Sequence, residues 1–230
     1  MTDICEKCAL RTKGICAVLI GTPPDAKVFE NRVQGAVPAR RYLQKQGDKH
    51  GLAKVIRSGW ASSIHVMSDG RVTASDVLVP GDFIGEDFLS KAAEVRSIRA
   101  MTDVEFCGFD VDFLKELIFS RPDIMEVLIE TGVEVARMLR ERVRDMGGRD
   151  AEGRIVSLMV GLYDRLRERG LLTGEQMPFP LRQQDIADAL GLSPVHVNRT
   201  LQQLRRLDVI SLEGRMLRVA NVDRMREMIA

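Results

Sequence analysis

The stretch Gln183-Gln-Asp-Ile-Ala-Asp-Ala-Leu-Gly-Leu-Ser-Pro-Val-His-Val-Asn-Arg-Thr-Leu-Gln202 decides how the C-terminal part of the chain folds. Ile186 and Leu190 lie four residues apart and give a first short helix its apolar face. Gly191 allows the positive φ of a tight turn, and Ser193, followed by a proline, fits the N-terminal cap of a second helix. The stretch therefore predicts a helix-turn-helix, the alternative being a helical pair used only for protein contacts.

The outer face of the second helix carries residue types that read DNA. Side chains near the N-terminal end of a recognition helix meet base edges. Arg199 suits a bidentate contact with guanine, and Asn198 or Gln202 suits adenine. The predicted DNA-binding residues are Ser193, Val195, His196, Asn198, Arg199, Gln202, Arg205 and Arg206.

Two short apolar runs, Val209-Ile-Ser-Leu212 and Met216-Leu-Arg-Val219, follow the second helix and flank Glu213-Gly214. They predict a β-hairpin, the wing of a winged helix-turn-helix. From residue 149 onward the chain has 13 Arg and no Lys against 11 acidic residues, a net charge of +2. DNA binding therefore depends on a local basic patch and on two copies per site.

A long helix is predicted over residues 120–148, with Ser120 as its cap and Pro122 in its first turn. About 26 residues at 1.5 Å each give a rod of roughly 40 Å. Apolar residues follow the 4-3-4-3 spacing of a heptad seam, which predicts a parallel homodimer; the alternative is a helix buried within its own domain. The predicted dimer interface is Met125, Ile129, Gly132, Ala136, Leu139, Val143 and Met146.

Residues from about 28 to 112 consist of short apolar runs separated by turn residues at roughly ten-residue intervals. The interruptions are Gly47-Asp48, Ser58-Gly59, Asp69-Gly70 and Pro80-Gly81-Asp82. Asp-Gly between two alternating runs is typical of a tight hairpin. The pattern predicts a β-sandwich or β-roll.

The cysteines are Cys5, Cys8, Cys16 and Cys107, of which the first three form a C-x2-C-x7-C pattern. Cysteines in a cytosolic protein more often bind metals or act in redox chemistry than form disulfides. Four thiolates are the usual ligands of an iron–sulfur cluster, and zinc accepts the same set. Redox-active or inert thiols remain a further reading, because Cys107 lies among apolar residues and is suited to a buried position.

Composition narrows the function. The 230 residues are 45% hydrophobic and 29% charged with a net charge of +1, which excludes a disordered chain, a membrane span and a polybasic coating protein. The apolar run of residues 16–20 is too short for a secretory signal, so a cytoplasmic protein is expected. His50, His65 and His196 show no ligand or triad spacing, so no enzyme is predicted.

The order of these parts resembles the Crp/Fnr family of bacterial transcription regulators over nearly the whole chain. Pro80-Gly-Asp-Phe-Ile-Gly-Glu86 is similar to the family's β-roll signature, and Leu190-Gly-Leu-Ser193 and Val197-Asn-Arg199 are similar to its helix-turn-helix. The resemblance implies an α+β fold, in which a cyclic-nucleotide-binding-like β-roll is followed by a long dimerisation helix and a C-terminal winged helix-turn-helix.

Within this family, the cysteines resemble those of the oxygen-sensing Fnr branch, in its α-proteobacterial form. That resemblance implies a [4Fe-4S] cluster on Cys5, Cys8, Cys16 and Cys107. Family members that bind cyclic AMP hold its phosphate with an Arg-Ser pair shortly before an Arg-Ala-x-Thr stretch. Here Arg99-Ala-Met-Thr102 is present but the matching pair is Glu94-Val95, and a carboxylate would repel phosphate; Arg96-Ser97 follows directly.

One departure concerns the recognition helix. The Fnr pattern is Glu-x-x-Ser-Arg, and the matching residues here are Val195-His-Val-Asn-Arg199. Arg199 is retained, but valine cannot accept a hydrogen bond from cytosine, so a different half-site is expected.

The sequence thus predicts four parts: a cysteine segment (1–20), a β-roll (21–119), a dimerisation helix (120–148) and a winged helix-turn-helix (149–230). The predicted function is a homodimeric regulator that binds a palindromic operator, under control of an oxygen- or NO-labile [4Fe-4S] cluster. RNA polymerase would be a partner if it activates transcription, and no membrane partner is expected. The alternatives are a regulator that senses a cyclic nucleotide or another small effector, with zinc-bound or redox-active cysteines, and an electron-transfer protein.

Overall fold

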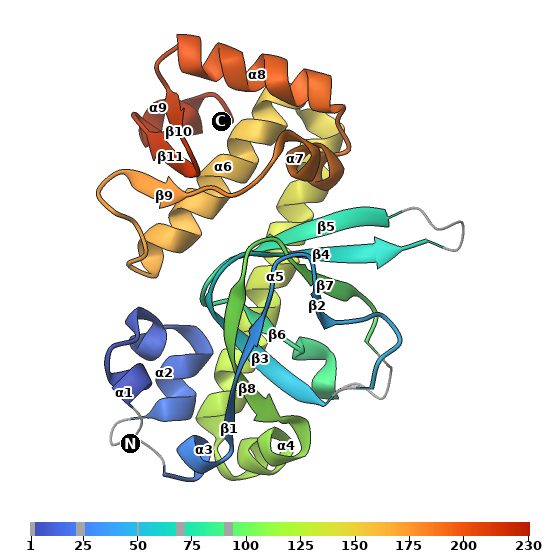
Figure 1. Cartoon of the computed structure of the whole chain (residues 1–230), viewed down its shortest axis with the longest axis vertical. Helices are drawn as coiled ribbons and strands as arrows, with labels where there is room; N and C mark the ends of the chain where they lie inside the picture. The colour runs from blue at the N-terminus through green and yellow to red at the C-terminus, as the bar shows by residue number, and fades with distance from the viewer. Residues whose placement is uncertain (1–2, 22–25, 50, 68–71, 90–93) are drawn as a thin grey trace. The chain divides into compact units, whose positions relative to one another are not determined.

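The computed structural model describes residues 3–21, 26–49, 51–67, 72–89 and 94–230 (Figure 1). The chain divides into two compact units, Met1–Ala136 and Arg137–Ala230. The strands of the first unit are β1 (Arg32–Val37), β2 (Tyr42–Gln44), β3 (Leu52–Ser58), β4 (Ala61–Val66), β5 (Val72–Leu78), β6 (Phe83–Ile84), β7 (Ser97–Ala100) and β8 (Val104–Asp110). Its helices are α1 (Asp3–Glu6), η1 (Ala9–Thr12), α2 (Gly14–Ile20), α3 (Ala26–Glu30), η2 (Glu86–Leu89) and α4 (Val111–Ser120). Helix α5 (Pro122–Gly148) begins in this unit and ends in the next.

The strands form two antiparallel four-stranded sheets, in the orders β1-β8-β3-β6 and β2-β7-β4-β5. The predicted β-roll is therefore confirmed. The Asp69-Gly70 turn lies outside the described residues, but the strands on either side of it pair as the hairpin prediction requires, with Val66 opposite Val72.

Two of the predicted glycine turns are built for glycine. Gly59 has a φ of +85°, and a Cβ atom there would lie 2.0 Å from the carbonyl oxygen of Asp103. Gly81 has a φ of +94° in the turn before β6. Across that turn, the backbone N–H of Asp82 donates to the carbonyl of Val79 (3.0 Å). The carboxylate of Asp82 in turn accepts from the backbone N–H of Val79 (2.8 Å).

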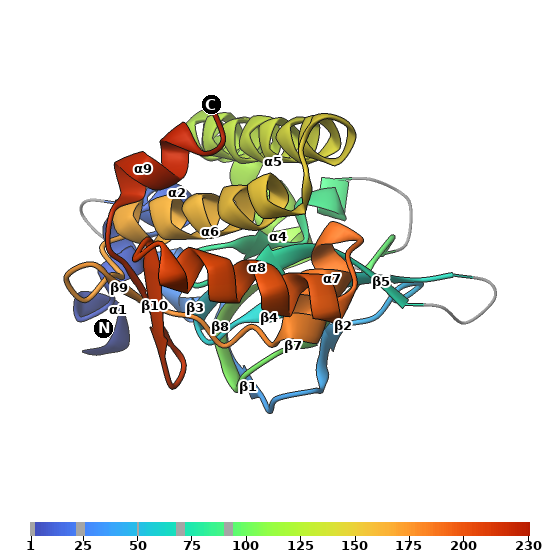
Figure 2. The same ribbon diagram turned by 90° about the horizontal axis from the view of Figure 1, so that it is seen from above.

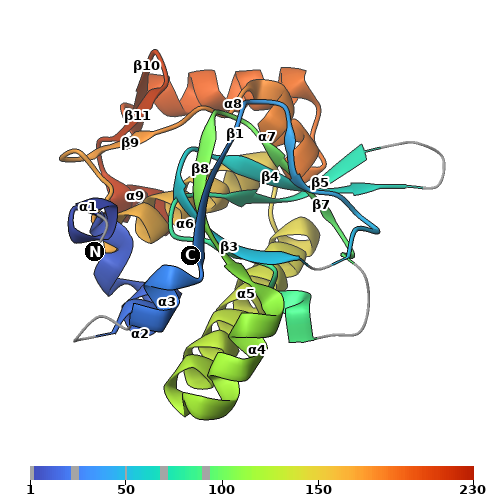
Figure 3. The same ribbon diagram turned by 60° about the horizontal axis from the view of Figure 1, so that its bottom comes forward.

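The first sheet has two differently covered faces, because successive side chains of a strand alternate. Ile56, Ile84 and Val104 point to the core between the two sheets. Val55 and Phe109 point the other way, into a core made with helices. That helical core is formed by Ile15, Leu19, Val28, Ala53, Val55, Phe83, Phe88, Phe109, Val111, Leu114, Leu117, Ile118 and Ile124. Helices α2, α4 and the start of α5 therefore pack on the outer face of the first sheet (Figure 3).

Helix α4 is capped by Asp110, whose carboxylate accepts from the N–H groups of Asp112 (2.9 Å) and Phe113 (3.0 Å). Ser120, expected to cap the long helix, instead ends α4, and its hydroxyl donates to the carbonyl of Leu117 (2.9 Å). Arg121 separates the two helices, and α5 then runs for 27 residues, close to the predicted length.

The second unit is a winged helix-turn-helix with α6 (Ala151–Glu168), β9 (Gln176–Pro178), α7 (Gln183–Leu190), α8 (Pro194–Arg206), β10 (Ile210–Glu213), β11 (Met216–Val219) and α9 (Val222–Glu227) (Figure 2). The predicted wing is confirmed, and β9 joins it in a three-stranded sheet of order β10-β11-β9. Arg226 of α9 forms an ion pair with Asp164 of α6 (2.7 Å). Within the described residues, none of the helices has the length and apolarity needed to cross a membrane.

Candidate DNA-binding surface and cysteine site

The turn between α7 and α8 has the geometry that the sequence predicts. Gly191 adopts a left-handed conformation (φ +65°, ψ 37°) and ends α7. The hydroxyl of Ser193 accepts from the N–H of His196 (3.2 Å), which caps α8. Val197 and Leu204 of α8 are fully buried, so the helix is held by one face and presents the other to solvent.

The solvent-facing side of α8 borders a shallow hollow of about 390 Å³. Its lining residues are Gln183, Pro194, Val195, Asn198, Arg199 and Gln202. Four of the predicted DNA-binding residues thus share one surface, since positions three, four and seven apart lie on one helix face. Gln183, the first residue of α7, was not predicted; its place at the hollow follows from how α7 packs beside α8, which the sequence pattern does not reveal.

The other predicted DNA-binding residues are also at the surface. Ser193, His196, Arg205 and Arg206 are exposed, the two arginines in the last turn of α8. These residues lie toward the two ends of α8, where they suit contacts with the DNA backbone on either side of a base-reading centre.

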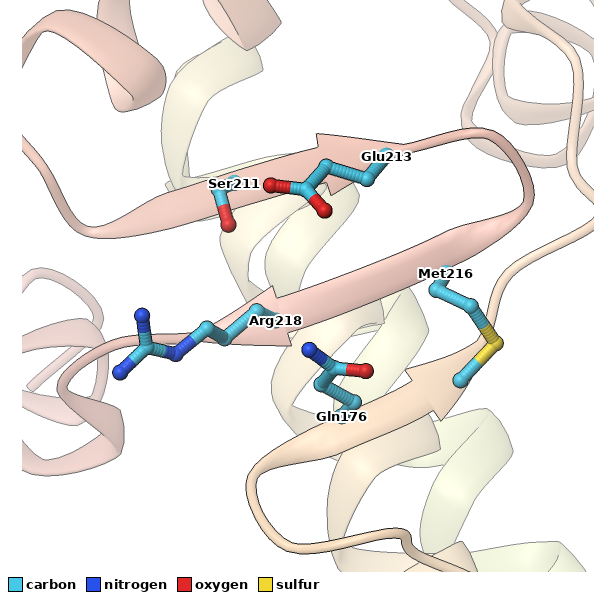
Figure 4. A pocket seen from close by; sticks show the side chains of 5 residues that line it. All are labelled: Gln176, Ser211, Glu213, Met216 and Arg218. Carbon is cyan, nitrogen blue, oxygen red and sulfur yellow. The ribbon is translucent and has the colours of Figure 1, made fainter.

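The wing carries a second, smaller hollow of about 100 Å³ on one face of its sheet (Figure 4). Side chains from all three strands line it: Gln176, Ser211, Glu213, Met216 and Arg218. Arg218 forms a 3.6 Å ion pair with Glu175, and Glu213 adds a second carboxylate. These carboxylates oppose the binding of an anion, so the hollow is less suited to a DNA phosphate than the surface of α8.

The N-terminal cysteines lie on or next to short helices. Cys5 is in α1, Cys8 precedes η1 and Cys16 is in α2. Gly14 begins α2 with a φ of +48°. Cys5 is buried, and the other two are partly buried.

Cys107 lies on β8, opposite Gln34 of β1 and Val55 of β3. It shares its sheet face with Phe109 and packs, together with Cys16, against the helical core. The fold therefore brings Cys107 to the side of the sheet on which the N-terminal segment lies, although 90 residues separate it from Cys16 in the sequence.

The four thiols are close enough to influence each other electrostatically. The pKa of Cys16 is raised to about 12, mainly by burial and further by the thiols of Cys107, Cys8 and Cys5. Burial is also the main cause of the raised pKa of Cys107. A thiol with a raised pKa is protonated at neutral pH and reacts slowly, so Cys16 lacks the environment of a reactive redox thiol.

Arg32 is a cation that acts on three of these thiols. Its guanidinium donates a hydrogen bond to Sγ of Cys5. Its positive charge lowers the pKa values of Cys16 and Cys107 and so partly offsets the effect of burial. Arg57, the other cation that acts on Cys107, forms an ion pair with Glu105 (2.7 Å).

A single metal ion and an iron–sulfur cluster require different arrangements of the cysteine ligands. Within the part of the chain that the structure describes, no three His, Cys, Asp or Glu side chains converge as the ligands of one ion do. The ligands of a [4Fe-4S] cluster each bind a different iron and stand further apart. Four neighbouring thiols, two of them against a dry core, match that donor set in number and in chemistry.

The residues that would meet a cyclic nucleotide's phosphate are engaged within the β-roll. Glu94 is buried, and its carboxylate accepts from the side-chain amide of Gln44 (2.8 Å). The hydroxyl of Ser97 accepts from the N–H of Gln46 (2.9 Å). A buried carboxylate at this position disfavours an anionic ligand.

The predicted dimer seam on α5 divides into two parts. Met125 is partly buried and packs against the helical core of the β-roll. Ala136 is partly buried, and Gly132 is exposed with open space where a Cβ would lie. The remaining large residues of the seam, together with Val133, have exposed fractions of 48–71%: Ile129, Val133, Leu139, Val143 and Met146.

Two family models match the chain in sequence, and they cover both units. The Crp-like helix-turn-helix domain matches residues 153–228, and the cyclic nucleotide-binding domain matches residues 35–121. Among curated relatives, the transcriptional activator protein FnrL of Cereibacter sphaeroides is 27% identical over 217 residues, which cover 92% of this chain and 85% of FnrL. A probable transcriptional activator of Rhizobium leguminosarum bv. viciae is 27% identical over 227 residues, 98% of this chain and 93% of the relative.

The chain belongs to the Crp/Fnr family of transcription regulators. Among solved structures, FixK2 from Bradyrhizobium japonicum superposes with a TM-score of 0.77 at 19% identity, covering 86% of this chain and 98% of FixK2. A likeness at this identity concerns the fold, and it agrees with the predicted α+β architecture.

Membership of the Crp/Fnr family confirms the prediction of a DNA-binding regulator. These relatives are transcription regulators rather than enzymes, as predicted for this chain. Within the family, the FnrL and FixK relatives place it near the Fnr branch.

Proposed function

We propose that this Crp/Fnr regulator binds its operator as a homodimer, under control of an oxygen- or NO-labile [4Fe-4S] cluster held by Cys5, Cys8, Cys16 and Cys107. The observation that carries the proposal is the gathering of thiols from α1, α2 and β8 on the sheet face that packs against the start of α5. Relatives that are named FnrL and anaerobic regulatory protein support an oxygen-linked role. When bound, such a cluster supplies sensitivity to oxygen or nitric oxide.

The chain's own residues connect the cysteine segment to α5. Ile15 and Leu19 of α2 share a core with Ile124 of α5, and Met125 and Leu128 pack against it. Any change that loosens α2 therefore removes contacts that position the first turns of α5. This packing is the proposed route from the sensor site to the dimer helix.

Arg121 forms a polar link along the same route. Its guanidinium donates to the carbonyl of Val18 in α2 (2.9 Å) and forms an ion pair with Asp123 in the first turn of α5 (2.6 Å). The hydrogen bond from Arg121 holds the pKa of Asp123 below its usual range. One side chain thus touches both the cysteine segment and the dimer helix.

Replacing Arg121 by Gln is expected to weaken this coupling while the cluster stays bound. A coupling free energy of about 1–2 kcal/mol would reduce the ratio of anaerobic to aerobic operator affinity by about 5–30-fold. The measurement is operator binding by fluorescence anisotropy with and without air, with the iron content determined in parallel. Lys115→Gln on α4 is the control, because Lys115 forms an ion pair with Asp112 on the same helix and lies outside the route. An unchanged affinity ratio in Arg121→Gln would contradict the proposed link.

The proposed dimer interface is the exposed apolar stripe of α5. Its 4-3-4-3 spacing matches a second copy of the same helix, because a heptad seam is self-complementary in a parallel pair. The open space at Gly132 allows two helices to approach closely. We therefore expect a second copy of α5 to cover the stripe. The predicted seam residues that it would bury are Ile129, Leu139, Val143 and Met146.

A dimer presents two copies of α8 to two half-sites one helical turn of DNA apart, about 34 Å. This symmetry implies a palindromic operator. Several relatives are activators by name, so we propose activation, for which RNA polymerase is the necessary partner.

Control by a cyclic nucleotide is the alternative that the matched domain name favours. The hydrogen bond from Gln44 to Glu94 argues against it, because a phosphate would have to approach a buried carboxylate and displace its amide partner. Calorimetry with cyclic AMP distinguishes the two. Binding of the nucleotide to iron-free protein, with an effect on operator affinity, would favour this alternative.

The test of the proposal is analysis of protein purified without oxygen. We expect about four iron and four acid-labile sulfide per chain, a visible absorption band that bleaches in air, and a dimer that dissociates as the band disappears. Metal analysis and sedimentation equilibrium under nitrogen and after air give these quantities. Stoichiometric zinc, or colourless protein without metal, would overturn the cluster and leave the DNA-binding assignment intact.

A further inference from the structure

Arg32 stands at the junction between the cysteine segment and the β-roll. It is the first residue of β1 and lies two positions from Gln34, which is opposite Cys107. Opposed residues of an antiparallel pair point to the same face, and so do residues two apart in one strand. Arg32 therefore leaves the sheet on the face that carries Cys107.

The guanidinium of Arg32 is held by two contacts. It donates to Sγ of Cys5, 27 residues earlier in the chain. The same group lies over the ring of Phe29 in α3, 5.3 Å from the centroid. A planar cation stacked on an aromatic ring keeps its N–H groups in one direction, so the donor is already oriented toward the cysteines.

We propose that Arg32 is a positioning residue of the cysteine site, which holds Cys5 in place and donates an N–H···S hydrogen bond to the ligand set. This inference rests on the proposed function. Four thiolates bring a concentrated negative charge into a partly dry site, and a partly buried cation beside them offsets it. Arg57 is committed to Glu105, whereas Arg32 contacts a thiol directly.

The role has two separate consequences. Before any iron binds, Arg32 ties α1 to β1 and limits the motion of the N-terminal segment. Once iron is bound, the hydrogen bond to sulfur retains it, since outer-shell partners of metal ligands typically change metal retention by 10–100-fold. A merely structural arginine would show the first effect without the second.

The test compares Arg32→Ala and Arg32→Lys with the parent protein, all prepared without oxygen. We expect Arg32→Ala to lose iron to a chelator at least about ten-fold faster and to shift the iron–thiolate stretching bands in resonance Raman spectra. Arg32→Lys, which keeps the charge without the stacked planar fork, should fall between the two. Lys13→Gln removes one positive charge from an exposed position of the same segment and should behave like the parent.

A second measurement uses the iron-free protein, so that a folding defect is recognised. Hydrogen exchange of residues 3–20 should accelerate in Arg32→Ala, while exchange in β3 and β8 stays unchanged. Equal rates of iron loss in the parent and in Arg32→Ala would overturn the inference and leave the cluster proposal standing. A parent protein that holds no iron would overturn both the cluster proposal and the inference. Equally fast iron loss from Lys13→Gln would show that the effect depends only on net charge, and would also overturn the inference.

Discussion

Replacing Cys107 by Ala is expected to abolish the full cluster and the air sensitivity of operator binding together. Cys107 is the proposed cluster ligand that lies on the β-roll, in β8. Without it, only the three cysteines of the N-terminal segment remain as proposed ligands. Operator affinity without oxygen should fall to the aerobic level of the parent, by about 5–150-fold for a coupling of 1–3 kcal/mol. Iron analysis and anaerobic anisotropy titrations measure both effects.

The control for this substitution is Val55→Ala. Val55 is opposite Cys107 in the register between β3 and β8 and is buried in the same core, but its side chain cannot bind iron. Its truncation should cost roughly 2 kcal/mol of unfolding free energy while the cluster is retained. A Cys107→Ala protein with four irons and normal air-sensitive binding would show that the ligand assignment is wrong.

Features that are decided by neighbouring residues could be predicted from the sequence. The turn between α7 and α8 depends on the freedom of Gly191 and the capping hydroxyl of Ser193, both readable in a few positions. The turns at Gly59 and Gly81 have the same local origin. The helix-turn-helix and the β-roll were therefore predictable with little knowledge of long-range packing.

Features that depend on packing between distant segments could not be predicted. The helices of the cysteine segment have four to seven residues, too few to be stable without the core that Ile15 and Leu19 enter. A heptad pattern also cannot say which turns of α5 meet the β-roll, and the packing of Met125 against that core was therefore not predicted. The hydrogen bonds of Arg32 with Cys5 and of Arg121 with Val18 join residues 27 and 103 positions apart, and no local pattern marks them.

Replacing Arg199 by Ala is expected to weaken operator binding and to remove the preference for one base pair in each half-site. Arg199 is exposed and lines the hollow of α8 beside Asn198 and Gln202, so its loss should leave folding unchanged. A bidentate arginine–guanine contact is worth about 1–3 kcal/mol, and two half-sites contribute roughly additively. The expected loss is therefore at least about 30-fold, measured on operators selected from random DNA by the parent protein.

Arg206→Ala distinguishes reading of a base from contact with the backbone. Arg206 lies in the last turn of α8, outside the hollow, where a phosphate contact is expected. Its loss should weaken all sequences alike and reduce the salt dependence of binding by about one phosphate contact per subunit. Arg199→Ala should instead leave the salt dependence nearly unchanged while one position of the selected sequence becomes degenerate. If Arg199→Ala lowers the salt dependence and keeps the full base preference, Arg199 contacts phosphate, and the reading of guanine must pass to another residue of the hollow.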